Sequence, residues 1–264
     1  NAVLVERKMG TAVMSSFHGF WSLGAGLGSF AGSRLLVASD LMAHALVVSI
    51  ACALMVAIAW PLALKDKGQT EEEKQQTEGK SVFKDLLPWM VGFMALFTMF
   101  PEGAVIDWAK LYLETELSVD PSLAGDAFAA FAFTMAALRF AGDSVRNRFG
   151  AVTTFRWSAI LSAVGFVMAS TAPALGLGLP GIIIGFAIAG IGIANTVPIC
   201  FSAAGNLKGY PPGAAIAVVT VLGYSGLLFV PPLIGFVSDH TGFAPIFFTM
   251  ALVVISTTLG AHLL

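Results

Sequence analysis

Two carboxylic acids interrupt an apolar stretch of the chain. They are Glu102 and Asp107, in FTMFPEGAVIDWAK at residues 97–110. An acid at membrane depth is costly and marks a functional site by default. Burial favours the protonated form, so such a carboxyl could load and release a proton near neutral pH. Both acids are candidates for proton coupling or solute binding. The alternatives are that Glu102 lies at the outer water interface or pairs with Arg34 or Lys110.

Four further side chains in apolar surroundings are candidates for the same site. His18 titrates in the physiological range, although a hydrogen-bonded packing histidine is an equal alternative. Asn195, in GIANTVPIC, could bind a solute or hydrogen-bond to a neighbouring helix. Trp21 and Tyr224 could stack on a solute, and the alternative is that they pack or face lipid.

The composition places these residues in lipid. Of the 264 residues, 57% are hydrophobic and 11% are charged, and the mean hydropathy is +0.84. Soluble domains carry about 25% charged residues. A net charge of −2 gives no basic surface for nucleic acid. No nucleotide-binding GxxxxGK[ST] motif is present, and Cys52 and Cys200 have no partner at ligand spacing. We therefore expect an integral membrane protein with no cofactor or metal.

Eight segments are apolar enough to span a bilayer, which takes about 20 residues. Their approximate ranges are 11–34, 40–64, 86–110, 121–141, 154–174, 178–203, 213–237 and 243–264. Pro101 predicts a kink or break in the third of these. The polar stretch at residues 65–85 cannot bury a core, so it is predicted to be a solvated linker.

The loops between the spans carry their basic residues on one side. Twelve of the fourteen Lys and Arg residues, Arg139 among them, fall in one alternating set of loops, and only Arg34 and Lys110 fall in the other. The positive-inside rule then places the linker and the C-terminus in the cytoplasm.

Glycines four residues apart, Gly24, Gly28 and Gly32, lie in the first span. In water such a stretch would suggest a loop. In lipid, small residues at this spacing let another helix approach closely, so these three glycines are predicted to line a helix-packing face.

A weak internal repeat relates residues 10–32 to residues 213–235. Both stretches begin and end on glycine, and they place Trp21 and Tyr224 at similar positions. Membrane transporters are often built from repeated halves. The repeat suggests that residues 86–264 form a six-span half and that residues 1–64 are the last two spans of another half.

Three motifs resemble the major facilitator superfamily of secondary transporters. Residues 1–32, NAVLVERKMGTAVMSSFHGFWSLGAGLGSFAG, are similar to the fourth-to-fifth helix region of a bacterial branch. Residues 139–150, RFAGDSVRNRFG, are similar to the cytoplasmic signature between the second and third helix of each half. Residues 226–242, GLLFVPPLIGFVSDHTG, are similar to the eleventh helix and its outer end. The resemblance covers the whole chain.

The resemblance implies an all-α polytopic membrane protein with a two-half helical bundle. About eight transmembrane helices are expected here, and the first three helices and part of the fourth are expected to precede residue 1. The signature implies that Asp143, Arg146 and Arg148 form a cytoplasmic gate. The alternative for the two arginines is a role as positive-inside anchors.

The function expected from this sequence is secondary active transport of a small solute by alternating access, coupled to protons, in a bacterial inner membrane. The alternatives are a transporter-like solute sensor and an uncoupled facilitator. No motif favours a membrane enzyme, and no re-entrant filter or ring of charge favours a channel.

Overall fold

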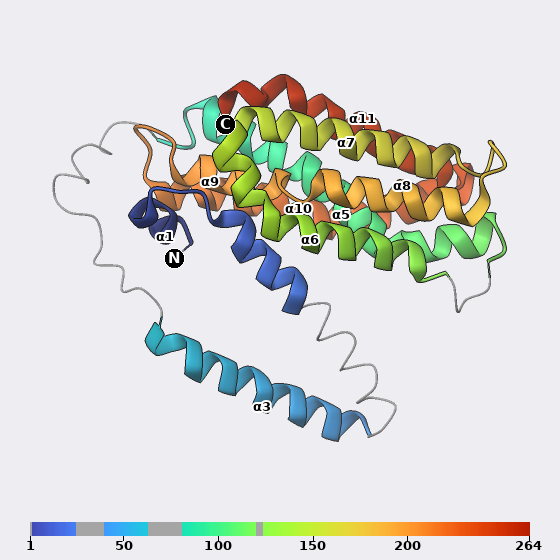
Figure 1. Ribbon diagram of the computed structural model, residues 1–264, viewed down its shortest axis with the longest axis horizontal. Coiled ribbons are helices and arrows are strands. Elements are labelled where there is room, and N and C mark those ends of the chain that lie inside the picture. Colours follow the sequence, from blue (N-terminus) through green and yellow to red (C-terminus); the bar gives the residue numbers. More distant parts are fainter. Residues whose placement is uncertain (1, 25–39, 63–80, 120–123) are drawn as a thin grey trace.

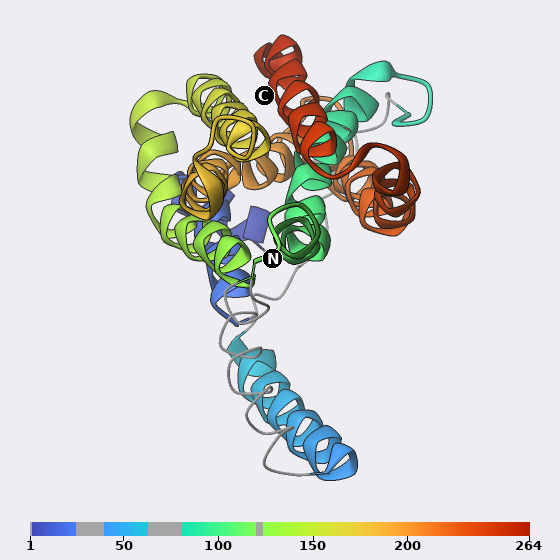
Figure 2. The ribbon, with the colours of Figure 1, turned by 90° about the vertical axis from the view of Figure 1, so that its right-hand side faces the viewer.

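The structure is a computed structural model that describes residues 2–24, 40–62, 81–119 and 124–264. Every regular element among these residues is a helix, as predicted, and the helices after residue 85 lie along one another as a bundle (Figure 1, Figure 2). The helices are α1 (Ala2–Met9), helix 14–24, α3 (Leu41–Ala59) with η1 (Trp60–Leu62), α5 (Leu86–Glu116), α6 (Asp126–Phe149), α7 (Ala151–Thr171), α8 (Gly178–Ile193), α9 (Thr196–Gly205), α10 (Pro212–Thr241), α11 (Ala244–Ser256) and η2 (Thr257–Leu263).

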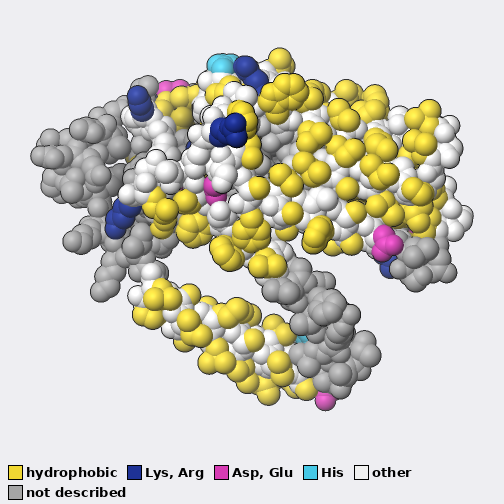
Figure 3. Space-filling model, viewed as in Figure 1, with side chains coloured by type: hydrophobic (Ala, Val, Ile, Leu, Met, Phe, Trp, Pro, Cys, Tyr) yellow, Lys and Arg dark blue, Asp and Glu magenta, His cyan; other side chains and the backbone are white. Residues whose placement is uncertain are grey.

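Seven spans in the described part of the chain are long and apolar enough to cross a membrane. They match seven of the eight predicted spans. The eighth, at residues 11–34, is helical over 14–24, and its remaining residues lie outside the described part. Hydrophobic side chains are spread over the face of the bundle that Figure 3 shows. Phe133 and Phe229 are 77% and 69% exposed, which suits side chains that face lipid.

The second span of residues 86–264 is longer than predicted. We expected it to end near residue 141, but α6 continues to Phe149 and carries Arg139, Asp143 and Arg146. The turn into α7 is made at Gly150, whose φ of +81° favours glycine. The prediction failed because these charged side chains have partners inside the protein and do not require the helix to end in water.

The fourth span is interrupted, whereas a single segment was predicted. α8 ends at Ile193 and α9 begins at Thr196. Pro198 has no N–H with which to bond the carbonyl of Ala194, four residues earlier. By contrast, α5 runs unbroken through Pro101, so the break allowed for at that proline is absent.

The start of α5 is fixed by Asp85. Its carboxylate accepts a hydrogen bond from the Leu87 amide at 3.3 Å and another from the Tyr210 hydroxyl. Burial and this hydrogen bond raise the pKa of Tyr210 to about 12. The end of the predicted linker is thereby tied to the connection between α9 and α10.

The buried apolar residues form two clusters at successive positions along α5. One includes Val91 and Ala95, and the other runs from Ala104 to Leu113. Glu102 lies between the two clusters and is itself 8% exposed. The acid therefore sits where the apolar packing of the bundle is interrupted.

Among the described residues, the closest approach of two helix backbones at a glycine is between α7 and α8. A Cβ atom on Gly165 would lie 2.3 Å from the Ala189 nitrogen, and one on Gly192 would lie 2.2 Å from the Ser162 nitrogen. These glycines let the two backbones touch.

The predicted glycine face of the first span is not seen at Gly24. This residue is exposed, and no described atom lies within 4 Å of where its Cβ would be. Gly28 and Gly32 lie outside the described residues. Gly19 instead makes the close approach in helix 14–24, where its Cβ position is 3.1 Å from the Phe140 ring.

We expect Gly165→Ala and Gly192→Ala each to destabilise the protein by about 1–3 kcal/mol, since two rigid backbones must separate to admit a methyl group. The measurement is thermal unfolding in detergent. The matched control is Gly213→Ala, because no atom of the described residues lies within 4 Å of the Cβ position there. A loss of stability in the control equal to that in the other two variants would contradict the close packing.

Candidate functional site

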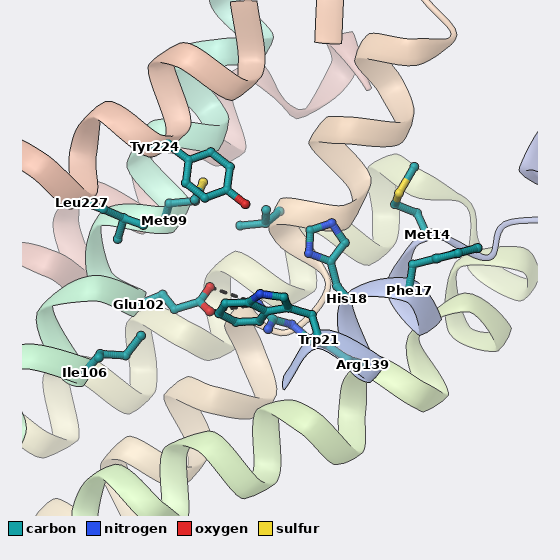
Figure 4. Close-up of a pocket in the computed structure, with 11 residues that line it drawn as sticks. Met14, Phe17, His18, Trp21, Met99, Glu102, Ile106, Arg139, Tyr224 and Leu227 are labelled. Carbon is teal, nitrogen blue, oxygen red and sulfur yellow. Dashed lines mark hydrogen bonds and ion pairs between the residues drawn. The ribbon is translucent and has the colours of Figure 1, made fainter. Parts of the chain in front are cut away.

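A cavity of about 240 Å³ lies between helix 14–24 and the helices of residues 86–264 (Figure 4). Its lining residues are Met14, Phe17, His18 and Trp21 of helix 14–24, Met99, Glu102 and Ile106 of α5, Arg139 of α6, Val197 of α9, and Tyr224 and Leu227 of α10. Four predicted site residues therefore line a single cavity: Glu102, His18, Trp21 and Tyr224.

The charged centre of the cavity is an ion pair between Glu102 and Arg139. Nη2 of Arg139 donates to both carboxylate oxygens of Glu102, at 3.1 and 3.0 Å. Arg139 is only 1% exposed. Breaking a buried pair by removing one partner leaves an uncompensated charge, which is strongly destabilising. Of the partners named as alternatives for Glu102, Lys110 instead lies 3.6 Å from Glu114, and Arg34 lies outside the described residues.

Two neutral groups complete the surroundings of the guanidinium. Nε of Arg139 donates to the carbonyl oxygen of Ala194 at 3.3 Å, and Nη1 donates to Oγ of Ser22 at 2.5 Å. The Ala194 carbonyl is available because Pro198 cannot donate to it. Arg139 therefore joins α5, the α8–α9 break and helix 14–24.

Two predicted site residues lie elsewhere. Asp107 is exposed and does not line the cavity, although it follows Glu102 on α5. Asn195 is 4% exposed and packs against Gly142 of α6, where a Cβ atom would lie 1.7 Å from its Oδ1. That oxygen has no hydrogen-bond partner among the described residues. Asn195 thus belongs to the helix break behind the cavity.

His18 lines the cavity on the face of helix 14–24 that meets α9. It is half-buried, and its ring centroid lies 5.8 Å from that of Phe201. Both predicted interpretations, a titrating site residue and a packing histidine, fit this position.

A second polar network lies further along α6, where residues 139–150 were predicted to form a gate. The Asp143 carboxylate accepts hydrogen bonds from the backbone N–H groups of Ser15 and Ser16, at 2.9 and 2.7 Å, and from Oγ of Ser16 at 2.5 Å. It thus caps the N-terminus of helix 14–24, where the exposed amides and the helix dipole favour a negative charge.

Arg146 extends this network to α1 and α9. Its Nη1 lies 3.0 Å from Oε1 of Glu6, and its Nη2 donates to Oγ of Ser202 at 2.8 Å. Ser202 in turn donates to the second oxygen of Glu6 at 2.5 Å. Arg148 stays outside the network, since it is exposed and its guanidinium lies 5.4 Å from the Phe149 ring centroid.

Comparison with known proteins decides the family. No family model matches the chain. An uncharacterized MFS-type transporter of Yersinia pestis is 30% identical over 262 residues, which are 99% of this chain and 66% of that protein. The chain belongs to the major facilitator superfamily. An uncharacterized transporter of Sinorhizobium fredii is 30% identical over 249 residues, covering 94% of this chain and 64% of its own length. Membrane protein MosC of Rhizobium meliloti is 34% identical over 153 residues, 58% of this chain and 37% of MosC.

The chain spans about two-thirds of the length of the first two of these relatives. Among solved structures, this superfamily member is similar to the fucose:proton symporter FucP of E. coli, with a TM-score of 0.69 over 93% of this chain and 66% of that one. The sequence identity is 17%, so this likeness shows the fold.

Sequence reasoning missed Arg139, Ser22, Glu6 and Ser202. Arg139 was counted with the loop cations because its charge ends the apolar run of α6. The signal that could have found it is Glu102 itself, since a buried acid within a membrane requires a partner on another helix. Ser22 and Ser202 have no comparable signal, because short polar residues are common in membrane helices. Glu6 has none because it stands beside Arg7 and Lys8, in a charged stretch that looks solvated.

We expect Glu102→Ala and Arg139→Met each to destabilise this superfamily member by about 3–5 kcal/mol, because either change leaves one buried charge unpaired. The double variant should lose less than the sum of the two, as measured by unfolding in detergent. The exposed pair Lys110–Glu114 is the control, and its removal should cost less than about 0.5 kcal/mol. Strictly additive losses at Glu102 and Arg139 would contradict the ion pair.

Proposed function

We propose that the protein is a secondary active transporter that moves a small solute by alternating access and couples this movement to protons through Glu102. The observation that carries the proposal is a buried carboxylate, paired with one guanidinium, in the wall of a cavity. Carriers of this kind bind solute near mid-membrane between two halves that rock around it. Residues 1–64 belong to one half, residues 86–264 form the other, and residues 65–85 link them.

Proton coupling follows from the unequal chemistry of the two partners. Arg139 stays charged at any accessible pH, whereas Glu102 can gain a proton. Protonation would abolish the attraction between them and release one end of a contact that also involves Ser22 of the other half. The fold neighbour FucP is named a fucose:proton symporter, which is consistent with a proton as the driving ion here.

The α6 network is proposed to be the cytoplasmic gate. Asp143 and Arg146 hold residues 6–16 against α6 and α9, so this end of the cavity is closed while their bonds are intact. Arg148 then serves as a positive-inside anchor. With Arg139 inside the bundle, eleven of the basic residues assigned to this side remain, against two on the other. The positive-inside rule thus makes this end, the linker and the C-terminus cytoplasmic in a bacterial inner membrane.

A solute sensor or an uncoupled facilitator would use the same cavity without a proton. Neither accounts for a buried acid that is ion-paired with Arg139 in the cavity wall. Among the described residues that line the cavity there is no pair of nucleophile and base that would favour an enzyme and no ring of like charge that would favour a channel.

Uptake by vesicles containing the full-length protein tests the coupling. A panel of solutes is offered with and without an inward proton gradient. We expect the gradient to accelerate uptake by the wild type, and Glu102→Gln to abolish that acceleration because it cannot titrate. Asp107→Asn, an exposed acid on the same helix, is the matched control and should keep it. An uptake rate that changes neither with the proton gradient nor on Glu102→Gln substitution would refute proton coupling through Glu102.

Hydrogen exchange tests the gate. Asp143→Ala removes the acceptor of three hydrogen bonds from Ser15 and Ser16, so we expect both backbone amides to exchange faster. Transport should also fall, since the closed state at this end loses its cap. Arg148→Ala is the control and should change neither. Unchanged protection at Ser15 and Ser16 in the Asp143 variant would count against the gate.

A further inference from the structure

We propose that the transported solute is a small monocarboxylate, which Arg139 binds in place of Glu102 when Glu102 is protonated. This inference rests on the proposed function, because it requires Glu102 to be the coupling carboxyl. One proton then enters with one anion, and the loaded site keeps the net charge of the empty one.

The charge balance of the cavity supports this exchange. Among the lining residues the formal charges are those of Glu102 and Arg139, which sum to zero. A proton on Glu102 would leave a guanidinium that is 1% exposed without a counter-charge. Its other two acceptors, the Ala194 carbonyl and the Ser22 hydroxyl, are neutral and cannot replace the lost charge. A buried charge left alone in this way is strongly destabilising.

No other described group near the pair can take over the neutralisation. His18 faces the cavity from helix 14–24 and can add only positive charge. Tyr224 faces it from α10, and the titratable residue of α9 is the buried Cys200. Asp143, one turn along α6, is directed at the amides of Ser15 and Ser16 and is not in contact with the guanidinium of Arg139 among the described ion pairs. We therefore assign the negative charge that contacts Arg139 in the loaded site to the solute.

The geometry of the pair indicates the chemical class of that charge. Glu102 places both carboxylate oxygens within 3.1 Å of one guanidinium nitrogen. Charge-assisted N–H···O⁻ bonds from a guanidinium are well suited to a carboxylate, and Nη2 of Arg139 is the nitrogen that makes them here. The side chain of Glu102 thus occupies the position that a solute carboxylate would take. A neutral solute would leave the site with one uncompensated positive charge, and a cation would leave it with two.

The remaining walls indicate an apolar body for the solute. Met99, Ile106 and Leu227 contribute aliphatic surface, and Trp21 contributes an aromatic ring. In Figure 4 the Tyr224 hydroxyl and the Trp21 ring face the same space as the Glu102 carboxylate. A few polar groups within an apolar wall are typical of sites that orient a small molecule by one end.

Chemical rescue of Glu102→Ala tests the proposal without knowledge of the natural solute. The probes are acetate, propionate and benzoate, each with its matched amide, added to the purified full-length protein. We expect the carboxylates to raise the melting temperature of Glu102→Ala and to bind it about tenfold to a hundredfold more tightly than the amides do, because their contact with Arg139 is charge-assisted. Glu102→Ala/Arg139→Met should show no such preference, and Glu114→Ala should not respond.

The outcomes separate this inference from the proposed function. Equal stabilisation by amides and carboxylates, no response to any carboxylate, or a response that persists without Arg139 would overturn the monocarboxylate. If Glu102→Gln nevertheless abolished gradient-driven uptake of a neutral solute, proton coupling through Glu102 would be supported and the monocarboxylate would be rejected. If carboxylates stabilised Glu102→Ala but uptake did not depend on the proton gradient, proton coupling would be rejected and carboxylate binding by Arg139 would be supported.

A second readout tests the charge balance directly. The uptake of benzoate or propionate that wild-type vesicles show above protein-free and Arg139→Met vesicles should respond to an imposed pH gradient and should not respond to an imposed membrane potential, since the loaded site carries no added charge. Uptake driven by the potential would overturn the one-proton, one-anion exchange.

Discussion

A guanidinium buried in an apolar bundle must have acceptors, and those of Arg139 organise the centre of this protein. The ion pair with Glu102 joins α6 to α5, and two further bonds reach Ala194 and Ser22. Because the side chain is almost fully enclosed, each lost acceptor exposes a charge that water cannot readily solvate. The relative positions of α5, α6, helix 14–24 and the α8–α9 break are therefore linked through one residue.

The break between α8 and α9 leaves a backbone carbonyl available to this arginine. An unbroken helix would use the Ala194 carbonyl in its own hydrogen-bond ladder, but Pro198 has no N–H to offer it. The side chain of Asn195, at the break, then needs room, which Gly142 provides because a Cβ there would lie 1.7 Å from Oδ1. A proline and a glycine, on different helices, thus make a backbone carbonyl into a ligand for a buried charge.

Hydropathy predicted the spans because lipid imposes one local rule on every membrane helix. The same rule misjudged α6, since Arg139 resembles a helix end unless its partner 37 residues away is known. Glu102 could be found by its depth, and Tyr224 and Trp21 by their matching positions. The glycine contacts could not, because Gly165 and Gly192 differ from Gly24 only in what lies opposite them. Local chemistry locates a costly residue, whereas its partner depends on the tertiary fold.

One face of α6 connects the cavity to the second network. Arg139, Asp143 and Arg146 are spaced by four and three residues, so they share a helical face. The first bonds Ser22, near one end of helix 14–24, and the second bonds Ser15 and Ser16 at its start. Two rigid helices are thus fastened at two points. Under the proposed function, a proton on Glu102 weakens the contact around Arg139 and Ser22. Because helices do not bend freely, a movement of helix 14–24 there also strains the hydrogen bonds between Asp143 and its start.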